Sequence, residues 1–147
     1  MITTLGEFTI TTDKSKMDIP VIHRYITRSY WAEGIPFETV AKAIEGSSLC
    51  FGVFHGEKQI GVARVITDTA TFAYLCDVFI DETYRGKGLG KWLMETILRH
   101  ESLQGLRRFA LTTKDAHGLY SQYGFTPLPI PERWMVIQDA DIYKKRK

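Results

Sequence analysis

Residues 72–90 constrain the fold of this chain more than any other stretch. Residues 72–80 read Phe-Ala-Tyr-Leu-Cys-Asp-Val-Phe-Ile, an apolar run with a single charge that is typical of a strand buried on both faces. A short polar connector leads to Arg85-Gly86-Lys87-Gly88-Leu89-Gly90, and an amphipathic helix follows. Because free N–H groups at a helix N-terminus attract negative charge, this unit predicts a site for a ligand that carries phosphates.

The size and composition of the chain predict one soluble domain over residues 1–147. With 147 residues, 44% hydrophobic and 24% charged, the chain has the proportions of an ordinary globular protein with a sizeable core. No apolar run approaches the ~18 residues of a membrane span, and the first residues lack the order of a signal peptide. We therefore expect no membrane association and a cytoplasmic location.

The net charge of +2 gives little support for a nucleic-acid surface. Four of the nineteen basic residues form the tail 144–147, and the remaining chain, with fifteen basic and seventeen acidic residues, carries −2. A short basic tail is most often a solvated chain end. Cys50 and Cys76 both lie in apolar strand-like runs, so we interpret them as buried hydrophobic residues and expect no disulfide and no metal site.

Periodicity and turn residues predict the element order β-αα-βββ-α-β-α-β. The expected strands are residues 5–12, 49–55, 59–67, 72–80, 107–113, 125–130 and 134–137. The first expected helix begins after the N-cap Asp18, and the others span residues 36–46, 89–100 and 115–123. Prolines at 127, 129 and 131 make the last strands hard to place. The helix between the fourth and fifth strands implies a crossover, so those strands should be parallel in an otherwise antiparallel, mixed α/β sheet.

Two common nucleotide motifs do not match the glycine turn. A dinucleotide fingerprint starting at Gly86 requires a third glycine where Lys91 stands. A P-loop ending at Gly90 and Lys91 requires a glycine at Arg85 and a hydroxyl residue at Trp92. What remains is Arg-x-x-Gly-x-Gly at the start of a helix, with Arg85, Lys87 and Lys91 as flanking cations. This combination favours pyrophosphate binding over a turn whose glycines serve only the backbone.

A second stretch, residues 116–125, reads Ala-His-Gly-Leu-Tyr-Ser-Gln-Tyr-Gly-Phe. Together with the glycine turn it resembles the two cofactor motifs of the GCN5-related N-acetyltransferase (GNAT) superfamily, whose second motif is Ala-x-x-Leu-Tyr-x-x-x-Gly-Phe. The predicted element order is also that of the family, so the resemblance covers nearly the whole chain. It implies the GNAT fold, with a central mixed sheet that splays open, and acetyl-CoA as cosubstrate.

The resemblance implies roles for particular residues. The strand end formed by Val78, Phe79 and Ile80 would pair with the pantetheine arm of the cofactor. The pyrophosphate would lie on Arg85, Gly86, Lys87, Gly88, Leu89, Gly90 and Lys91. Tyr120 matches the tyrosine that protonates the departing thiolate in many members. The sequence departs from the family at Thr113, where an asparagine that contacts the pantetheine is common.

Asp77 is the most informative residue for the acceptor. It is the only charge in an apolar strand, and an unpaired buried carboxylate costs several kcal/mol, so Asp77 must be paired or must open onto a cleft. Base, amine anchor and structural aspartate remain open as its role. Trp31 and Glu33 lie in the link between the first two helices, and in the family this link covers the acceptor pocket. The two side chains suit a cationic or amine-bearing acceptor, and a loop anchored by its aromatic residues is the alternative interpretation.

These features predict an acetyl-CoA-dependent N-acetyltransferase that transfers the acetyl group directly to a primary amine of a small molecule or a protein. The alternative is a non-catalytic module that senses acyl-CoA. No metal, nucleic acid or membrane is expected as a partner, and the last strands allow a homodimer. Neither the acceptor nor the oligomeric state follows from the sequence.

Overall fold

The computed structural model describes residues 1–144 and builds them around one six-stranded sheet in the order β1-β2-β3-β4-β5-β6. The strands are β1 (Ile2–Leu5), β2 (Phe8–Thr11), β3 (Leu49–His55), β4 (Lys58–Thr67), β5 (Phe72–Ile80) and β6 (Arg108–Leu111). The helices are α1 (Ile19–Ile26), α2 (Phe37–Gly46), α3 (Leu89–Arg99) and α4 (His117–Ser121). Single 3-10 turns span Lys14–Lys16, Glu82–Tyr84, Glu101–Leu103 and Pro131–Arg133.

The sheet has the predicted mixed topology. Neighbouring strands from β1 to β5 are antiparallel, and β5 and β6 are parallel because α3 carries the chain across the sheet between them. The mixed sheet, the crossover and the helix pair before β3 confirm the predicted fold class.

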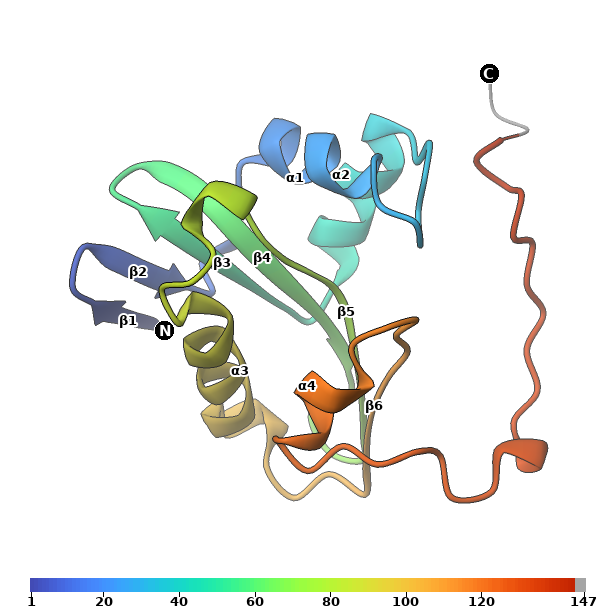
Figure 1. The fold of residues 1–147 in the computed structure, drawn as a ribbon. Coiled ribbons are helices and arrows are strands. Elements are labelled where there is room, and N and C mark those ends of the chain that lie inside the picture. Colours follow the sequence, from blue (N-terminus) through green and yellow to red (C-terminus); the bar gives the residue numbers. More distant parts are fainter. Residues whose placement is uncertain (145–147) are drawn as a thin grey trace.

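The core has two layers, one on each face of the sheet. Figure 1 shows α1 and α2 on one face and α3 with α4 on the other. Ile22, Ile26, Val40 and Ile44 are the buried residues of α1 and α2, while α3 buries Leu89, Leu93, Met94 and Ile97. The predicted N-cap also forms, since the side chain of Asp18 accepts a hydrogen bond from the N–H of Val21.

The first predicted strand is wrong in its bounds, since residues 5–12 do not form one strand. Gly6 adopts φ +58°, the left-handed region that L-residues rarely occupy, and the chain turns there between β1 and β2. A tight hairpin therefore replaces the single edge strand. The remaining predicted strands up to residue 113 are present, although β6 is shorter than the expected 107–113.

The two C-terminal strands predicted at 125–130 and 134–137 do not form within the described chain. Pro127, Pro129 and Pro131 lack backbone N–H groups and cannot donate to a ladder, and the last of them starts a 3-10 turn, Pro131–Arg133. The chain instead continues as an extended arm that rises beside the sheet without joining it (Figure 1). The arm ends the described part at Lys144, which pairs with Asp141 at 3.6 Å, and residues 145–147 of the basic tail lie outside it.

Candidate active site

A cleft opens where β5 and β6 part. Their parallel pairing ends at Leu75 and Leu111, yet β5 continues to Ile80. The expected burial of β5 on both faces therefore holds only in part: Ala73, Leu75 and Phe79 are buried, whereas the residues between them are half-buried. The cleft has a volume of about 1200 Å³ and is bounded by β5, the residues after β6, the α1–α2 link and the C-terminal arm.

A bulge in β5 lies inside this cleft. The register between β4 and β5 shifts between Val62 and Arg64, and Asp77 adopts φ +53°, which is uncommon outside glycine. Gly61 pairs with Ile80 beyond the bulge, and a Cβ there would approach the carbonyl oxygen of Phe79 to 2.7 Å. The two strands meet too closely here for a side chain on β4, and the bulge turns the carboxylate of Asp77 toward the α1–α2 link.

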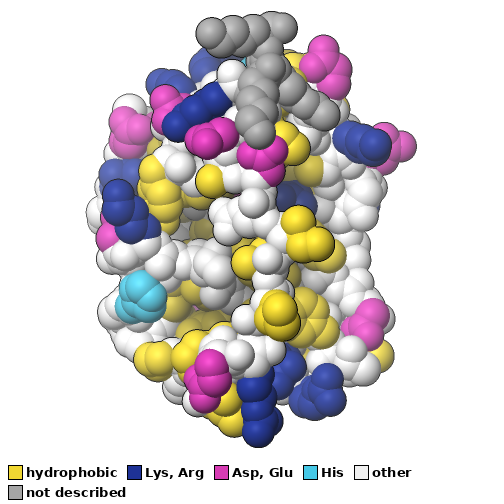
Figure 2. All heavy atoms as spheres, turned by 90° about the vertical axis from the view of Figure 1, so that its right-hand side faces the viewer, with side chains coloured by type: hydrophobic (Ala, Val, Ile, Leu, Met, Phe, Trp, Pro, Cys, Tyr) yellow, Lys and Arg dark blue, Asp and Glu magenta, His cyan; other side chains and the backbone are white. Residues whose placement is uncertain are grey.

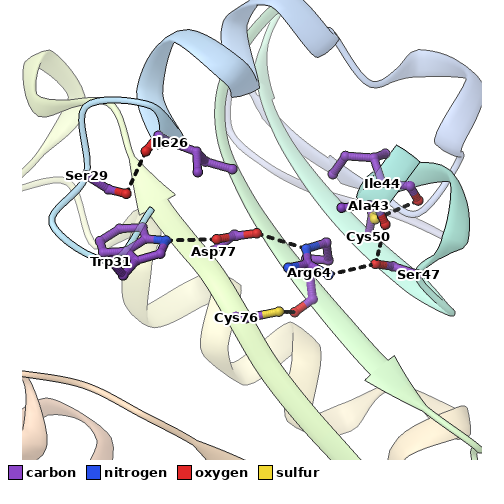
Figure 3. A network of polar contacts seen from close by, with 10 residues as sticks. All are labelled: Ile26, Ser29, Trp31, Ala43, Ile44, Ser47, Cys50, Arg64, Cys76 and Asp77. Atoms are coloured by element: carbon purple, nitrogen blue, oxygen red, sulfur yellow. Dashed lines mark hydrogen bonds and ion pairs between the residues drawn. The ribbon is translucent and has the colours of Figure 1, made fainter. Parts of the chain in front are cut away.

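Both carboxylate oxygens of Asp77 accept hydrogen bonds. Trp31 Nε1 donates to one oxygen at 2.8 Å, and Arg64 Nε on β4 donates to the other at 2.9 Å, as Figure 3 shows. Arg64 also donates from Nη1 to the hydroxyl of Ser47 at 3.2 Å, which in turn donates to the carbonyl oxygen of Ala43 at the end of α2. The buried charge predicted at Asp77 is thus balanced by an ion pair, and the network joins the link, β5, β4 and α2.

The ion pair with Asp77 also stabilises the protonated form of Arg64. Burial alone would lower the pKa of this guanidinium, but Asp77 and the nearby cysteines outweigh burial and raise it. Sequence reasoning missed Arg64 because no recognisable motif includes it, and only the strand register brings it to Asp77.

The glycine turn forms a small concave surface at the start of α3. Gly86 and Gly88 adopt φ +81° and +77°, and Gly88 is the N-cap without a side-chain hydrogen bond to the helix. The first N–H groups of α3 are therefore left for an external acceptor. A cavity of about 260 Å³ lies against this turn, lined by Ile80, Tyr84, Arg85, Gly86, Gly88, Leu89 and Gly90.

The predicted cofactor residues divide into four groups, one of which, Gly86, Gly88 and Leu89, lines only the cavity at the turn. Val78, Ile80, Arg85 and Gly90 line the large cleft, and the last three also line the cavity at the turn. The side chain of Phe79 is buried on the α1 side, where it stacks on Tyr25 with ring centroids 3.9 Å apart, although its backbone borders the cleft. Lys87 and Lys91 are exposed and line neither space, so they contribute charge at a distance.

Tyr120 lies on α4 and lines the same cleft, across from β5. Burial, with a smaller contribution from Tyr30, raises the pKa of its hydroxyl, which therefore keeps its proton well above neutral pH. The loop before α4 is ordered by Thr113, whose side chain accepts a hydrogen bond from the N–H of Ala116 at 3.1 Å. Thr113 also lines the cleft, at the position where the family often has asparagine.

Trp31 and Glu33, the residues expected to contact the acceptor, both border the cleft and are exposed. Tyr30, which sequence reasoning missed, ties the link to the far wall: its hydroxyl accepts a hydrogen bond from the N–H of Lys114 at 3.0 Å. The arm residues 138–140 and 142–144 form the outer wall and were also missed, because nothing in the sequence predicts a structure for the residues after the last expected strand, 134–137.

Other chemical groups in the described chain are few. Cys50 is buried and Cys76 half-buried, and both are free thiols. Within residues 1–144 there is no group of three or more His, Cys, Asp or Glu side chains placed to hold a metal ion. No helix of that segment combines the length and hydropathy that a membrane span requires.

Comparison with known proteins agrees with this geometry. The family model described as "Acetyltransferase (GNAT) domain" matches residues 46–127, which include β3 to α4. A Gibberella zeae protein is 30% identical over 142 residues, with 81% of this chain and 78% of that protein covered. A crystal structure from Xanthomonas campestris pv. campestris is 46% identical with a TM-score of 0.92, and covers 97% of this chain and 100% of its own. Both are named putative acetyltransferases, the second of the GNAT family.

More distant relatives match only part of their own length or share only the fold. An uncharacterized N-acetyltransferase ycf52-like protein of Prochlorococcus marinus is 34% identical over 99 residues, but the match covers only 55% of its length. Glucosamine-6-phosphate N-acetyltransferase of Arabidopsis thaliana shares the fold, with a TM-score of 0.61 over 89% of this chain and 97% of its own, at 19% identity. From the matched domain, the two relatives that align over most of the chain and the splayed sheet, we conclude that this chain is an acetyltransferase of the GNAT family.

Proposed function

We propose that this protein transfers an acetyl group from acetyl-CoA directly to a primary amine of a small molecule or a protein. The observation that carries the proposal is a single cleft that brings together the open edge of β5, the uncapped start of α3 and Tyr120. The GNAT family uses acetyl-CoA, which supplies the activated acetyl thioester.

The chain fits this cosubstrate at both ends of the cleft. We assign the pyrophosphate to the turn 85–91, because Gly86 and Gly88 have the left-handed backbone found in anion-binding turns, and no atom lies within 4 Å of a Cβ built at Gly90. We assign the pantetheine amides to the backbone of residues 78–80, which lie beyond the last residue of β5 that pairs with β6. A backbone N–H of the same segment is the candidate donor to the carbonyl oxygen as negative charge develops there.

Tyr120 is the candidate proton donor in this proposal. As the amine nitrogen bonds to the acetyl carbon and the carbon–sulfur bond breaks, the Tyr120 hydroxyl gives its proton to the departing sulfur. The amine loses its own proton to water in the open cleft, and Tyr120 then regains one from solvent. The raised pKa of Tyr120 supports this role, because the hydroxyl is protonated at the start of each cycle.

We assign Asp77 a positioning role among the three that the sequence left open. Its two carboxylate oxygens already accept hydrogen bonds from Trp31 and Arg64, which leaves it poorly placed to take a proton from the amine. Asp77 instead holds the indole of Trp31 at the mouth of the cleft. The indole face and the exposed carboxylate of Glu33 are then available to a cationic or amine-bearing acceptor.

The protonation of the Cys76 thiol favours direct transfer over a covalent acetyl-enzyme. Cys76 lines the cleft, and burial raises its pKa to about 12, so the group is a neutral thiol at physiological pH. Because the thiolate is the nucleophilic form of cysteine, Cys76 is a weak candidate for an acetyl carrier.

The test combines thiol release and mass detection. Acetyl-CoA is incubated with the protein and a panel of amines, free thiol is followed over time, and acetylated products are identified by mass. Tyr120→Phe should lower turnover by about 10²- to 10⁴-fold while the shift in melting temperature on adding CoA is retained. Tyr123→Phe is the matched control, because Tyr123 follows α4 without lining the cleft and should keep normal turnover.

Stabilisation by CoA without thiol release for any amine would favour an acyl-CoA sensor instead, and a trapped acetyl-enzyme would contradict direct transfer.

A further inference from the structure

Arg64 is a cleft-lining cation with more hydrogen-bond donors than the protein uses. Its Nε donates to Asp77 and its Nη1 to the hydroxyl of Ser47, as Figure 3 shows, and the described chain offers no acceptor to Nη2. A guanidinium has five N–H donors, so with two of them engaged about three remain for another partner.

The Nη2 atom of Arg64 reaches solvent. Every buried side-chain nitrogen and oxygen of the described residues has a hydrogen-bond partner, and Nη2 has none among those residues, so Nη2 must be accessible. The Arg64 side chain as a whole is only 17% exposed, and Arg64 is one of the residues that line the cleft. The unused N–H groups of Arg64 are therefore available to a ligand in the cleft.

The other cations of the cleft are less suited to hold an anionic group. Arg28, Arg85, Lys114 and Lys144 line the cleft but are exposed, where water and salt weaken a charge. Figure 2 views the side of the molecule on which the arm lies and shows Lys and Arg side chains mainly near its outline. Arg64 is half-buried, and its two protein partners fix the plane of the guanidinium. A fixed guanidinium matches the two oxygens of a carboxylate.

Arg64 also lies close to the position expected for the thioester. The proposed function places the pyrophosphate after the end of β5 and the pantetheine on residues 78–80, so the cofactor runs back along β5 toward the bulge at Asp77. Arg64 pairs with Cys76, the residue before the bulge. An anionic group on Arg64 would therefore lie one or two strand residues from the reacting amine, roughly 3–7 Å. The amine and the carboxylate of one small amino acid are separated by a distance of this order.

Charge balance in the cleft favours a ligand that carries both signs. Asp77 already neutralises Arg64, so a simple anion would leave this part of the cleft with a net negative charge. A simple amine would leave the remaining N–H groups of Arg64 without a ligand partner. A zwitterion adds no net charge, pairs its carboxylate with Arg64, and brings an ammonium group that Asp77 and Glu33 attract.

We propose that the acceptor is a free amino acid, or a similarly small amine with a carboxylate, and that Arg64 binds this carboxylate through its unused N–H groups. The inference rests on the proposed acetyl transfer and narrows its acceptor. The amine nitrogen bonds to the acetyl carbon, the CoA thiol leaves, one proton passes to water, and the product is an N-acetylated amino acid. A protein N-terminus does not fit, because its nearest carboxyl group is part of a peptide bond.

The test compares each common amino acid with its carboxamide as acceptor, through thiol release from acetyl-CoA. The carboxamide keeps the amine and the side chain, loses the negative charge, and resembles the first residue of a peptide. At least one amino acid should have a kcat/KM about tenfold or more above that of its carboxamide. Thiol release without any such preference would overturn the inference and leave the transferase standing, whereas no release with any amine would overturn both.

Two arginine variants test the assignment of the carboxylate to Arg64. Arg64→Lys keeps a positive charge beside Asp77 but has no Nη2, so the preference for amino acid over carboxamide should fall about 10- to 100-fold. Arg28→Lys is the matched control, because Arg28 lines the same cleft but is exposed, and its preference should stay within about twofold. An equal loss for amino acid and carboxamide in Arg64→Lys would contradict carboxylate binding, as would a preference lost only in Arg28→Lys.

A binding measurement on the parent protein makes the test independent of how Arg64→Lys folds. With CoA bound, calorimetry should show that the N-acetylated form of the preferred amino acid binds about tenfold or more tightly than its carboxamide. Equal affinities of the two compounds would contradict the proposal.

Discussion

The indole of Trp31 donates a 2.8 Å hydrogen bond to Asp77, which lies 46 residues further along the chain. This contact joins the link between α1 and α2 to the bulge of β5, and the ion pair of Asp77 with Arg64 extends it to β4 (Figure 3). The only charge in β5 thus holds an aromatic side chain at the mouth of the cleft. The first two predictions separate the halves of this network.

Asp77→Asn should lower turnover with little change in CoA affinity. Asparagine tolerates the positive φ at this position about as well as aspartate does, so the bulge should persist. The substitution removes the charge that balances Arg64, and an amide cannot accept two hydrogen bonds on separate oxygens. We expect a loss of about 1–3 kcal/mol in the free energy of unfolding, measured by urea titration. Unchanged turnover and stability would remove Asp77 from any role in the site.

Trp31→Phe should act on the acceptor alone. Phenylalanine keeps an aromatic ring but cannot donate to Asp77, so the link loses its fixed contact while the Arg64–Asp77 ion pair stays. Because Trp31 is 45% exposed, the free energy of unfolding should change by less than about 1 kcal/mol. The KM for the acceptor should rise about five- to tenfold, with CoA-induced stabilisation unchanged. A rise in the KM for acetyl-CoA instead would place Trp31 on the cofactor side.

Gly90→Ala should make the protein more stable and a weaker CoA binder. Gly90 is the second residue of α3, does not have a positive φ, and no atom lies within 4 Å of a Cβ placed there. Alanine in a helix is favoured over glycine by about 0.5–1 kcal/mol, so the melting temperature should rise. The added methyl group would enter the space assigned to the pyrophosphate, so CoA should bind more weakly in calorimetry.

Gly88→Ala provides the contrast to Gly90→Ala. Gly88 has φ +77°, which costs an L-residue roughly 1–2 kcal/mol, so this variant should lose stability as well as CoA affinity. A Gly90→Ala protein that binds CoA as tightly as the parent would show that the pyrophosphate lies elsewhere.

The free energy of unfolding should decrease in alkaline solution, and the shifted ionisation of the Cys76 thiol is one cause. Burial raises the pKa of this thiol from 9.0 to about 12, so between these values the unfolded chain releases a proton that the folded protein keeps. The folded state then binds more protons than the unfolded state, and the free energy of unfolding falls as pH rises above about 9. Below that range both states are protonated and the contribution is constant.

Cys76→Ala should flatten this decline by up to about 1.4 kcal/mol per pH unit, measured by urea titrations between pH 8 and pH 10.5. Burial also raises the pKa of Cys50, so Cys50 contributes to the decline that remains. An identical pH slope in Cys76→Ala and the parent would show that the Cys76 thiol titrates normally in the folded protein.

Several features of the site follow from the sequence because their causes are local. The glycine turn depends on residues that tolerate positive φ, and Gly86 and Gly88 adopt it. The helix after them depends on the spacing of its apolar residues, and Leu89, Leu93 and Ile97 are buried accordingly. Burial cost alone identifies Asp77 as a residue that requires a partner.

The C-terminal end shows where local reasoning fails. Residues 134–137 have strand composition, yet strand formation requires a neighbouring edge with free donors and acceptors. The three prolines before this segment cannot donate to a ladder, and the segment does not join the sheet. Composition indicates that a segment is suited to a strand, and only the arrangement of the rest of the chain provides or withholds the neighbouring strand.

The sequence by itself determined the element types up to α4, the glycine turn, the family and the residue in β5 that could not remain unpaired. Only the tertiary structure decided that Arg64 and Trp31 are its partners, that the arm forms the outer wall of the cleft, and that β6 keeps an open edge. The physical reason is how far along the chain the residues lie that decide each feature. Backbone conformation and amphipathic spacing depend on neighbours a few residues away, whereas the partners of a side chain depend on strand register and on the bulge at Asp77, which combine contributions from the whole sheet.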